Sequence, residues 1–134
     1  MTGFILHLQA TTQYERITGV VSLVAEDASG SFGILAGHER LVTTLVPGLA
    51  RFRTDSVAFW QYLALPGAVL YFVNNELFIN TRRYLRGTDY AGISAALEAQ
   101  LLAEERELTR LKQSLHQMEE EMFKRLWQMG RRIP

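Results

Sequence analysis

Few residues in the sequence have the types and spacing that chemistry requires. The three histidines, His7, His38 and His116, lie far apart, and none stands in an HxH or HExxH pattern, the spacings that hold a metal ion. Each is expected to be an ordinary surface or packing histidine. The chain has no cysteine, which excludes disulfides, thiolate metal sites and a cysteine nucleophile. We therefore predict no metal site and no cofactor.

Two further segments resemble reactive motifs only superficially. Gly30-Ser31-Phe32-Gly33 lacks the lysine of a phosphate-binding loop and does not open a helix, so we interpret it as a tight turn or bulge between strands. Glu104, Glu105, Glu107 and Glu119–Glu121 lie on a predicted exposed helix with no apolar pocket to raise a carboxyl pKa. We expect them to form a solvated face, and we predict no catalytic residue.

Charge and hydropathy exclude two classes of partner. Fourteen basic and fourteen acidic residues cancel, so the chain lacks the positive field typical of proteins that bind nucleic acid or anionic membranes. No apolar run approaches the roughly 18 residues needed to span a bilayer, and Met1–Thr12 lacks the pattern of a signal peptide. We expect neither nucleic-acid binding nor direct membrane insertion.

The elements that would position any site begin with an all-β region, predicted over residues 1–86. Short runs of Val, Ile, Leu, Phe and Tyr are separated by turn residues, which is typical of strands. We expect a bend or bulge at Gly19, and two runs, Val57–Leu65 and Ala68–Val73, are apolar on both faces. The turn signals are Pro47-Gly48, Thr54–Ser56, Pro66-Gly67 and Asn74-Asn75. Such frequent turns indicate a meander or sandwich of short antiparallel strands.

A helical arm is predicted over residues 87–134, which makes the fold class α+β. Between Ala91 and Met129 there is no proline, and no glycine after Gly92, while strong helix formers dominate. Thr88 or Asp89 can serve as the N-cap. The arm is either one long helix or a helical hairpin, and a hairpin would most easily break around Gln113–Gln117.

One stripe of this arm is apolar, with residues three and four apart. It comprises Leu108, Leu111, Leu115, Met118 and Met122. Arg82, Arg83 and Arg86 lie at the joint between sandwich and arm, where they can pair with arm glutamates or meet an acidic partner. One hypothesis is therefore an adaptor that dimerises through a coiled coil. A metal-dependent β-barrel enzyme would need clustered ligands, and the β region has only His7 and His38.

Two longer motifs resemble a known family. Gly30–His38, followed by Leu41–Leu45 and Pro47-Gly48, resembles the N-terminal domain signature of the ε subunits of F-type ATP synthases. A second match runs from Gly67 through Asn80 to Arg86-Gly87. The resemblance covers nearly the whole chain and implies an N-terminal antiparallel β-sandwich of about ten short strands. It also implies a non-catalytic subunit, peripheral on the cytoplasmic face of the bacterial inner membrane, that couples ion translocation to ATP synthesis. The implied partners are the γ subunit, the c ring and the catalytic head.

The resemblance also implies which surfaces make these contacts. The turns Asp27–Ser31 and Ala36–Arg40 correspond to family loops that face the polar loops of the c ring. The implied contact residues are Glu26, Ser31, His38 and Glu39, whose polar side chains suit a wet interface.

In this family the C-terminal helices can extend into the catalytic head and block ATP hydrolysis, which is a two-state switch. The apolar stripe and the basic residues Lys124, Arg125, Arg131 and Arg132 fit such an arm. The positions of a family ATP-binding motif are occupied by Ala91 and Ser94, so no bound ATP is expected. The Glu-rich tail resembles the ε subunits of alternate, often sodium-associated ATPases.

Overall fold

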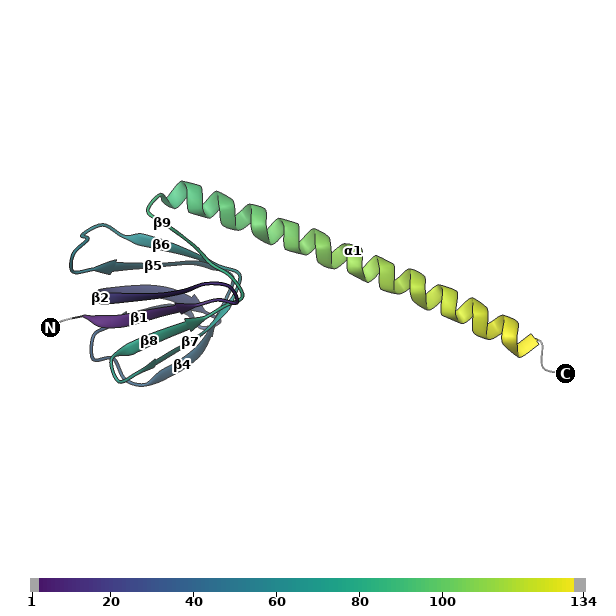
Figure 1. Cartoon of the computed structure of the whole chain (residues 1–134), viewed down its shortest axis with the longest axis horizontal. Helices are drawn as coiled ribbons and strands as arrows, with labels where there is room; N and C mark the ends of the chain where they lie inside the picture. Colours follow the sequence, from purple (N-terminus) through teal and green to yellow (C-terminus); the bar gives the residue numbers. More distant parts are fainter. Residues whose placement is uncertain (1–2, 132–134) are drawn as a thin grey trace. The chain divides into compact units, whose positions relative to one another are not determined.

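The computed structural model describes residues 3–131, which contain nine strands followed by one helix (Figure 1). The strands are β1 (Phe4–Gln9), β2 (Tyr14–Asp27), β3 (Gly30–Leu35), β4 (Leu41–Leu45), β5 (Gly48–Thr54), β6 (Gln61–Leu65), β7 (Ala68–Val73), β8 (Glu76–Asn80) and β9 (Leu85–Gly87). The helix is α1 (Tyr90–Arg131). The predicted α+β class, a β-sandwich followed by a helical arm, is confirmed.

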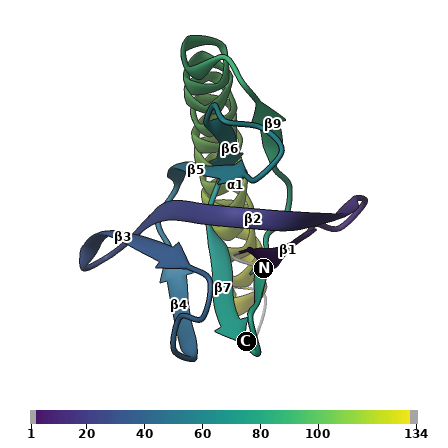
Figure 2. The same cartoon turned by 90° about the vertical axis from the view of Figure 1, so that its left-hand side faces the viewer.

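The long strand β2 connects the two layers of the sandwich. Its first half pairs with β1, and its second half pairs with β3 and β5. Gly19, at φ 68°, lies where the register of β2 shifts against β1, between Ile17 and Val20, so the bend predicted there is confirmed. Figure 2 shows β2 extending across the sandwich, with β1 beside one end and β3 beside the other.

The remaining strands complete a layer on each side of β2. On one side, β5 pairs with β6 and β6 with β9; on the other, β1, β8, β7 and β4 pair in that order. The β1–β8 pair is parallel, and the other pairs are antiparallel. The inner faces enclose the core, whose largest fully buried side chains include Phe4, Phe52 and Phe72.

The turns follow the sequence signals in part. Asn74 and Asn75 have φ angles of 52° and 59° and join β7 to β8 as a two-residue hairpin. At Pro47-Gly48 and Pro66-Gly67 the chain passes between strands that do not pair with each other, so these turns change layers. The predicted strand Val57–Leu65 is wrong in its first half, because β6 begins at Gln61 and residues 57–60 lie beyond its last pair with β5.

The interpretation of Gly30–Gly33 as a turn is also wrong, because these residues belong to β3. The turn lies one step earlier, at Ala28 and Ser29. The Asp27 carboxylate accepts a hydrogen bond from the Ser29 backbone N–H at 2.9 Å, which closes the turn before Gly30. Gly30, at φ 122°, then starts the strand in a conformation that favours glycine.

Of the two forms expected for the arm, the structure has the single helix. Asp89 occupies the N-cap position, and its backbone carbonyl accepts from Ile93 N–H at 3.0 Å. The helix is unbroken through Gln113–Gln117 (Figure 1), because that segment contains no glycine or proline. At 1.5 Å per residue the helix is about 63 Å long. No helix in the described part of the chain is both long and apolar enough to span a membrane.

The chain divides into two compact units, Met1–Glu98 and Ala99–Pro134. The first two turns of α1 belong to the sandwich unit because they pack on it. Leu97 is buried, and the Tyr90 ring meets the Tyr62 ring edge-on at a centroid distance of 5.3 Å. A Cβ atom at Gly87 would lie only 2.9 Å from the Ile93 side chain, so glycine at this position lets the helix approach β9 closely.

Candidate functional site

The four predicted contact residues are all exposed and fall into two pairs. Glu26 and Ser31 are cross-strand neighbours at the β2–β3 turn. His38 and Glu39 lie in the turn that follows β3. β3 lies between the two pairs, and its six residues span about 17 Å at about 3.4 Å per residue.

The pair at the β2–β3 turn is supported by Asp27. Its carboxylate accepts hydrogen bonds from the Ser29 hydroxyl at 2.5 Å and from the Thr43 hydroxyl of β4 at 2.7 Å. These bonds lower the pKa of Asp27 below its ordinary value of 3.8, and the bond from the Ser29 hydroxyl has the largest effect. The ionised carboxylate therefore ties the turn to β4.

Asn75 supports the other turn. Its side-chain oxygen accepts a hydrogen bond from Gly37 N–H at 2.8 Å, and its amide nitrogen donates to the Gly3 carbonyl at 3.0 Å. One side chain in the β7–β8 hairpin thus holds both the turn after β3 and the segment before β1. The sequence did not predict this role for Asn75, because the Asn74-Asn75 turn already explained an asparagine at this position.

His38 is fixed at the surface of this turn. Its Nδ1 donates to the Glu39 backbone carbonyl at 2.7 Å, and its ring meets the Phe72 ring edge-on at 5.8 Å between centroids. With Nδ1 carrying the proton, Nε2 of the neutral ring is an acceptor. This turn therefore exposes a histidine and a carboxylate at the surface.

The predicted stripe of the arm is exposed along its length. Leu108, Leu111, Leu115, Met118 and Met122 are 51–62% exposed, and Lys124 and Arg125 are exposed beside them. The stripe extends further than predicted, since Phe123, Leu126, Trp127 and Met129 are 60–77% exposed. The three- and four-residue spacing continues through Leu126 and Met129 and was the available signal. The Arg131 side chain and Arg132 lie outside the described residues.

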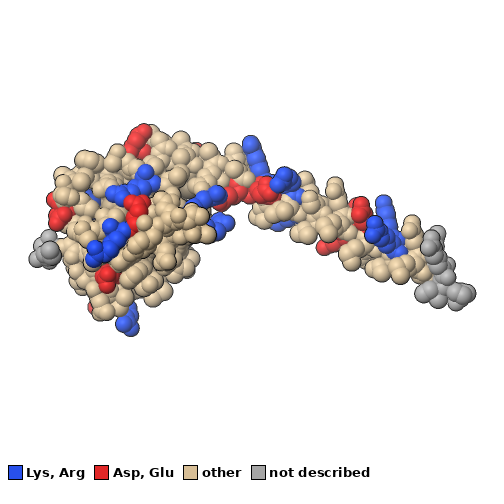
Figure 3. Space-filling model, in the orientation of Figure 1, with Lys and Arg blue, Asp and Glu red and all other residues tan. Residues whose placement is uncertain are grey.

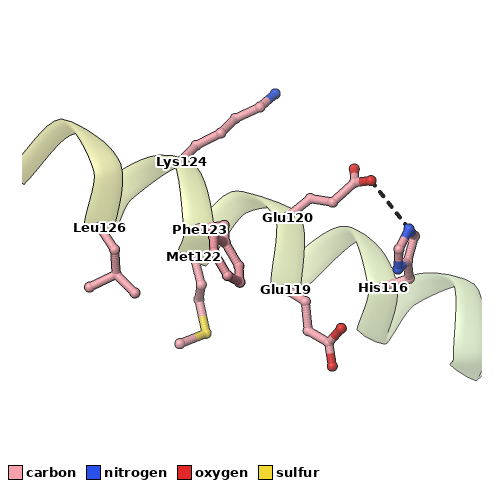
Figure 4. A pocket seen from close by; sticks show the side chains of 7 residues that line it. All are labelled: His116, Glu119, Glu120, Met122, Phe123, Lys124 and Leu126. Atoms are coloured by element: carbon pink, nitrogen blue, oxygen red, sulfur yellow. Dashed lines mark ion pairs between the residues drawn. The ribbon is translucent and has the colours of Figure 1, made fainter.

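A hollow of about 700 Å³ lies against the end of this stripe. Figure 4 shows that His116, Glu119, Glu120, Met122, Phe123, Lys124 and Leu126 line it and that all come from α1. One helix supplies a single wall, so the hollow is an open surface and does not enclose a ligand. Its apolar floor of Met122, Phe123 and Leu126 suits contact with another protein surface.

The joint before α1 is organised by Glu15 of β2. Its carboxylate accepts from the Arg86 guanidinium at 2.6 Å and from the Tyr84 hydroxyl at 2.7 Å. The pKa of Tyr84 is raised mainly by burial, and further by its hydrogen bond to Glu15 and by the charge of Glu15. Arg86 also donates to Gln61 at 2.8 Å. The sequence left open whether Arg86 pairs with a glutamate of the arm or meets an acidic partner. Pairing with an arm glutamate is wrong, because Arg86 pairs with Glu15 of the sandwich.

Within residues 3–131 no three His, Cys, Asp or Glu side chains gather as metal ligands. Figure 3 shows basic and acidic side chains intermixed over the face in view. The arrangement offers two polar turns and an exposed apolar stripe, which are features of contact surfaces.

Residues 5–87 match the family model of the ATP synthase delta/epsilon chain β-sandwich domain. The chain belongs to this family. The resemblance predicted from the two sequence motifs is confirmed. The ε chain 2 of ATP synthase from Cereibacter sphaeroides is 36% identical over 99 residues, which cover 71% of this chain and 67% of that one. The ε chain 2 from Paraburkholderia xenovorans is 36% identical over 81 residues, 59% and 57% of the two chains.

Solved ATP synthases contain chains with the same fold as this ε-family protein. A chain in the Euglena gracilis mitochondrial ATP synthase (OSCP, F1 and c ring) aligns with a TM-score of 0.58 and 22% identity, over 72% of this chain and 62% of that one. One in the Tetrahymena thermophila mitochondrial ATP synthase (central stalk and c ring) aligns with a TM-score of 0.50 and 16% identity, over 60% and 64%. The match thus spans less than two thirds of these structural relatives and of the Paraburkholderia chain.

Proposed function

We propose that the protein is the non-catalytic ε subunit of a bacterial rotary F-type ATP synthase, joining the γ subunit to the c ring. The observation that carries this proposal is the family match over residues 5–87, which spans all nine strands except for one residue of β1. In this role the protein couples ion translocation to ATP synthesis or hydrolysis, while catalysis resides on other subunits. It lies peripherally on the cytoplasmic face of the membrane and binds no cofactor.

The two polar turns are the proposed contacts with the c ring. Glu26 and Ser31 lie at one end of β3, and His38 and Glu39 lie at the other. Asp27 and Asn75 hold the two turns in place, so little order has to be gained on binding. Both turns flank β3, and the proposal therefore requires the c ring to meet the sandwich along this strand.

The exposed stripe of α1 is the proposed regulatory contact. Apolar side chains from Leu108 to Met129 remain exposed, and Lys124 and Arg125 suit acidic surfaces of the catalytic head. An arm of this kind inhibits ATP hydrolysis when it enters the head. The adaptor hypothesis unrelated to ATP synthase is not favoured, because the family match accounts for the sandwich itself.

Co-elution with the γ subunit of its own source, followed by ATPase assays of the F1 core, tests this function. Two forms are compared, the full chain and a truncation after Glu98, which keeps the turns of α1 that pack on the sandwich. Binding of both forms, with faster hydrolysis for the truncation, supports an inhibitory ε subunit. Absence of γ binding by both forms contradicts the proposal.

A further inference from the structure

Two arginines on the outer face of β5 both contact one tryptophan ring. Arg51 and Arg53 are two residues apart on the strand, so their side chains lie on the same face. Their guanidinium carbons lie 4.7 and 4.8 Å from the centroid of the Trp60 ring. Both arginines are exposed, and Trp60 is half-buried. We call Arg51, Trp60 and Arg53 the Arg–Trp–Arg cluster.

The cluster has no carboxylate of its own. Elsewhere in the sandwich Arg86 pairs with Glu15 and His7 with Glu76, but among the residues that the structure describes no acidic side chain pairs with Arg51 or Arg53. Contact with an aromatic ring restrains a guanidinium, while its N–H donors, which lie in the guanidinium plane, remain available. Both guanidinium groups are therefore held in place, and their N–H donors remain available to bind carboxylates.

The positions opposite the cluster are uncharged and partly apolar, and the exposed carboxylate of Glu26 lies on the same face, two residues from Val24 along β2. Across the sheet Arg51 is opposite Val24, which is opposite Gly33. Arg53 is opposite Ser22, which is opposite Leu35. Leu35 is 62% exposed, and Phe59, next to Trp60 in the chain, is 60% exposed.

This combination favours a protein as the occupant. Interfaces between proteins are enriched in arginine and aromatic residues with apolar neighbours, as in this cluster. A lipid surface or a nucleic acid is recognised by a larger collection of basic residues, whereas this chain has no net charge.

We propose that the Arg–Trp–Arg cluster is a docking site for an acidic protein segment, whose carboxylates pair with Arg51 and Arg53 while apolar neighbours pack on Leu35 and Phe59. The inference rests on the proposed function, because the partner is sought within the ATP synthase. It adds a contact on β5 and the loop before β6, beside the β2 and β3 strands that carry the turns assigned to the c ring.

The test measures binding to detergent-solubilised ATP synthase of the same source from which this subunit has been removed. Labelled wild-type chain is compared with the double variant R51Q/R53Q, with W60L, which keeps both charges but removes the ring, and with R16Q. Arg16 is an exposed arginine of β2, paired with His7 in the β1–β2 ladder, and serves as the matched control. Urea unfolding of each variant confirms that the sandwich is folded.

The double variant is expected to bind about tenfold more weakly and with less dependence on salt, and W60L to bind more weakly than wild type, while R16Q keeps wild-type affinity. Equal affinity of the wild type and R51Q/R53Q overturns the inference but leaves the proposed function standing. Failure of the wild type itself to bind refutes the proposed function and, with it, this docking site.

A second measurement separates protein from phosphate as the source of the anion. Vesicles of phosphatidylcholine and phosphatidylglycerol, at about three to one, are mixed with the same variants. Negligible vesicle binding by the wild type supports a protein partner. If the wild type binds vesicles, and R51Q/R53Q abolishes this binding without changing binding to the complex, the proposal is overturned in favour of a lipid headgroup.

Discussion

The Arg86 guanidinium of β9 lies 2.6 Å from the Glu15 carboxylate of β2. Arg86 also lies over the Phe52 ring at 5.5 Å and donates to Gln61. One side chain thus fastens the last strand before α1 to three other strands. The side chains of Arg86 and Glu15 are 33% and 32% exposed, so solvent screens their attraction only in part.

Loss of this pair should destabilise the sandwich. We expect Arg86→Ala to lower the free energy of unfolding by about 1–2 kcal/mol, because it leaves Glu15 and the buried Gln61 without a charged donor. Urea unfolding followed by circular dichroism measures the change. The matched control is Arg110→Ala, which removes the Arg110–Glu107 pair, whose side chains are 71% and 54% exposed. An equal effect of both substitutions would show that Arg86 contributes no more than a surface pair.

Protonation of Asp27 should weaken the β2–β3 turn. The pKa of Asp27 is lowered in the folded protein. Asp27 therefore stabilises the fold fully above its pKa in the unfolded chain, near 3.8, and this stabilisation is lost as the pH falls through its lower pKa in the folded protein. We expect Asp27→Asn to be less stable than wild type at pH 7, with a difference that shrinks below about pH 4. Urea midpoints between pH 3 and pH 7 measure it. A difference that does not vary with pH would contradict this role.

The proposed c-ring contacts can be tested by cross-linking, because the chain has no native cysteine. Ser31→Cys and His38→Cys, each labelled with a short photoactivatable reagent, are expected to cross-link to the c subunit in the assembled complex. Val69→Cys is the control, since Val69 is exposed on β7 but belongs to neither turn. Cross-links to c from the control alone would place the contact elsewhere.

The exposed stripe of α1 should carry any inhibition of ATP hydrolysis. We expect Leu115→Gln with Met118→Gln to relieve inhibition without weakening γ binding, because both side chains are more than half exposed and lie outside the sandwich unit. Gln113→Ala and Gln117→Ala, in the same segment, are the controls. ATPase rates of reconstituted F1 are the measurement. Loss of γ binding in the stripe variant would instead assign the stripe to assembly.

Much of the fold follows from local sequence signals. Strong helix formers, with no proline and no glycine between Gly92 and Met129, predicted helix from Ala91 onward, and Asn74-Asn75 predicted a turn, because these features act within a few residues. The parallel β1–β8 pair and the passage between layers at Pro47 and Pro66 depend on contacts between distant segments, which no local pattern contains. Val57–Ala58 looked like strand because they are apolar, yet they have no partner strand.

The candidate surfaces were predictable to different degrees. The stripe from Leu108 to Met122 followed directly from helical periodicity, and its exposure in the structure now extends it to Met129. The supporting roles of Asp27 and Asn75 arise from tertiary hydrogen bonds. The Arg–Trp–Arg cluster joins residues of β5 to a residue in the loop before β6, so its three members become neighbours only when the chain turns back.

Ion pumping driven by ATP tests the central claim most directly. ATP synthase of the same source, depleted of this subunit and reconstituted in vesicles, is supplied with the chain comprising residues 1–98 or with the full chain. An ε subunit that joins γ to the c ring is expected to restore pumping coupled to ATP hydrolysis with the sandwich unit alone. ATP hydrolysis that remains uncoupled from pumping after addition of either form would contradict the account.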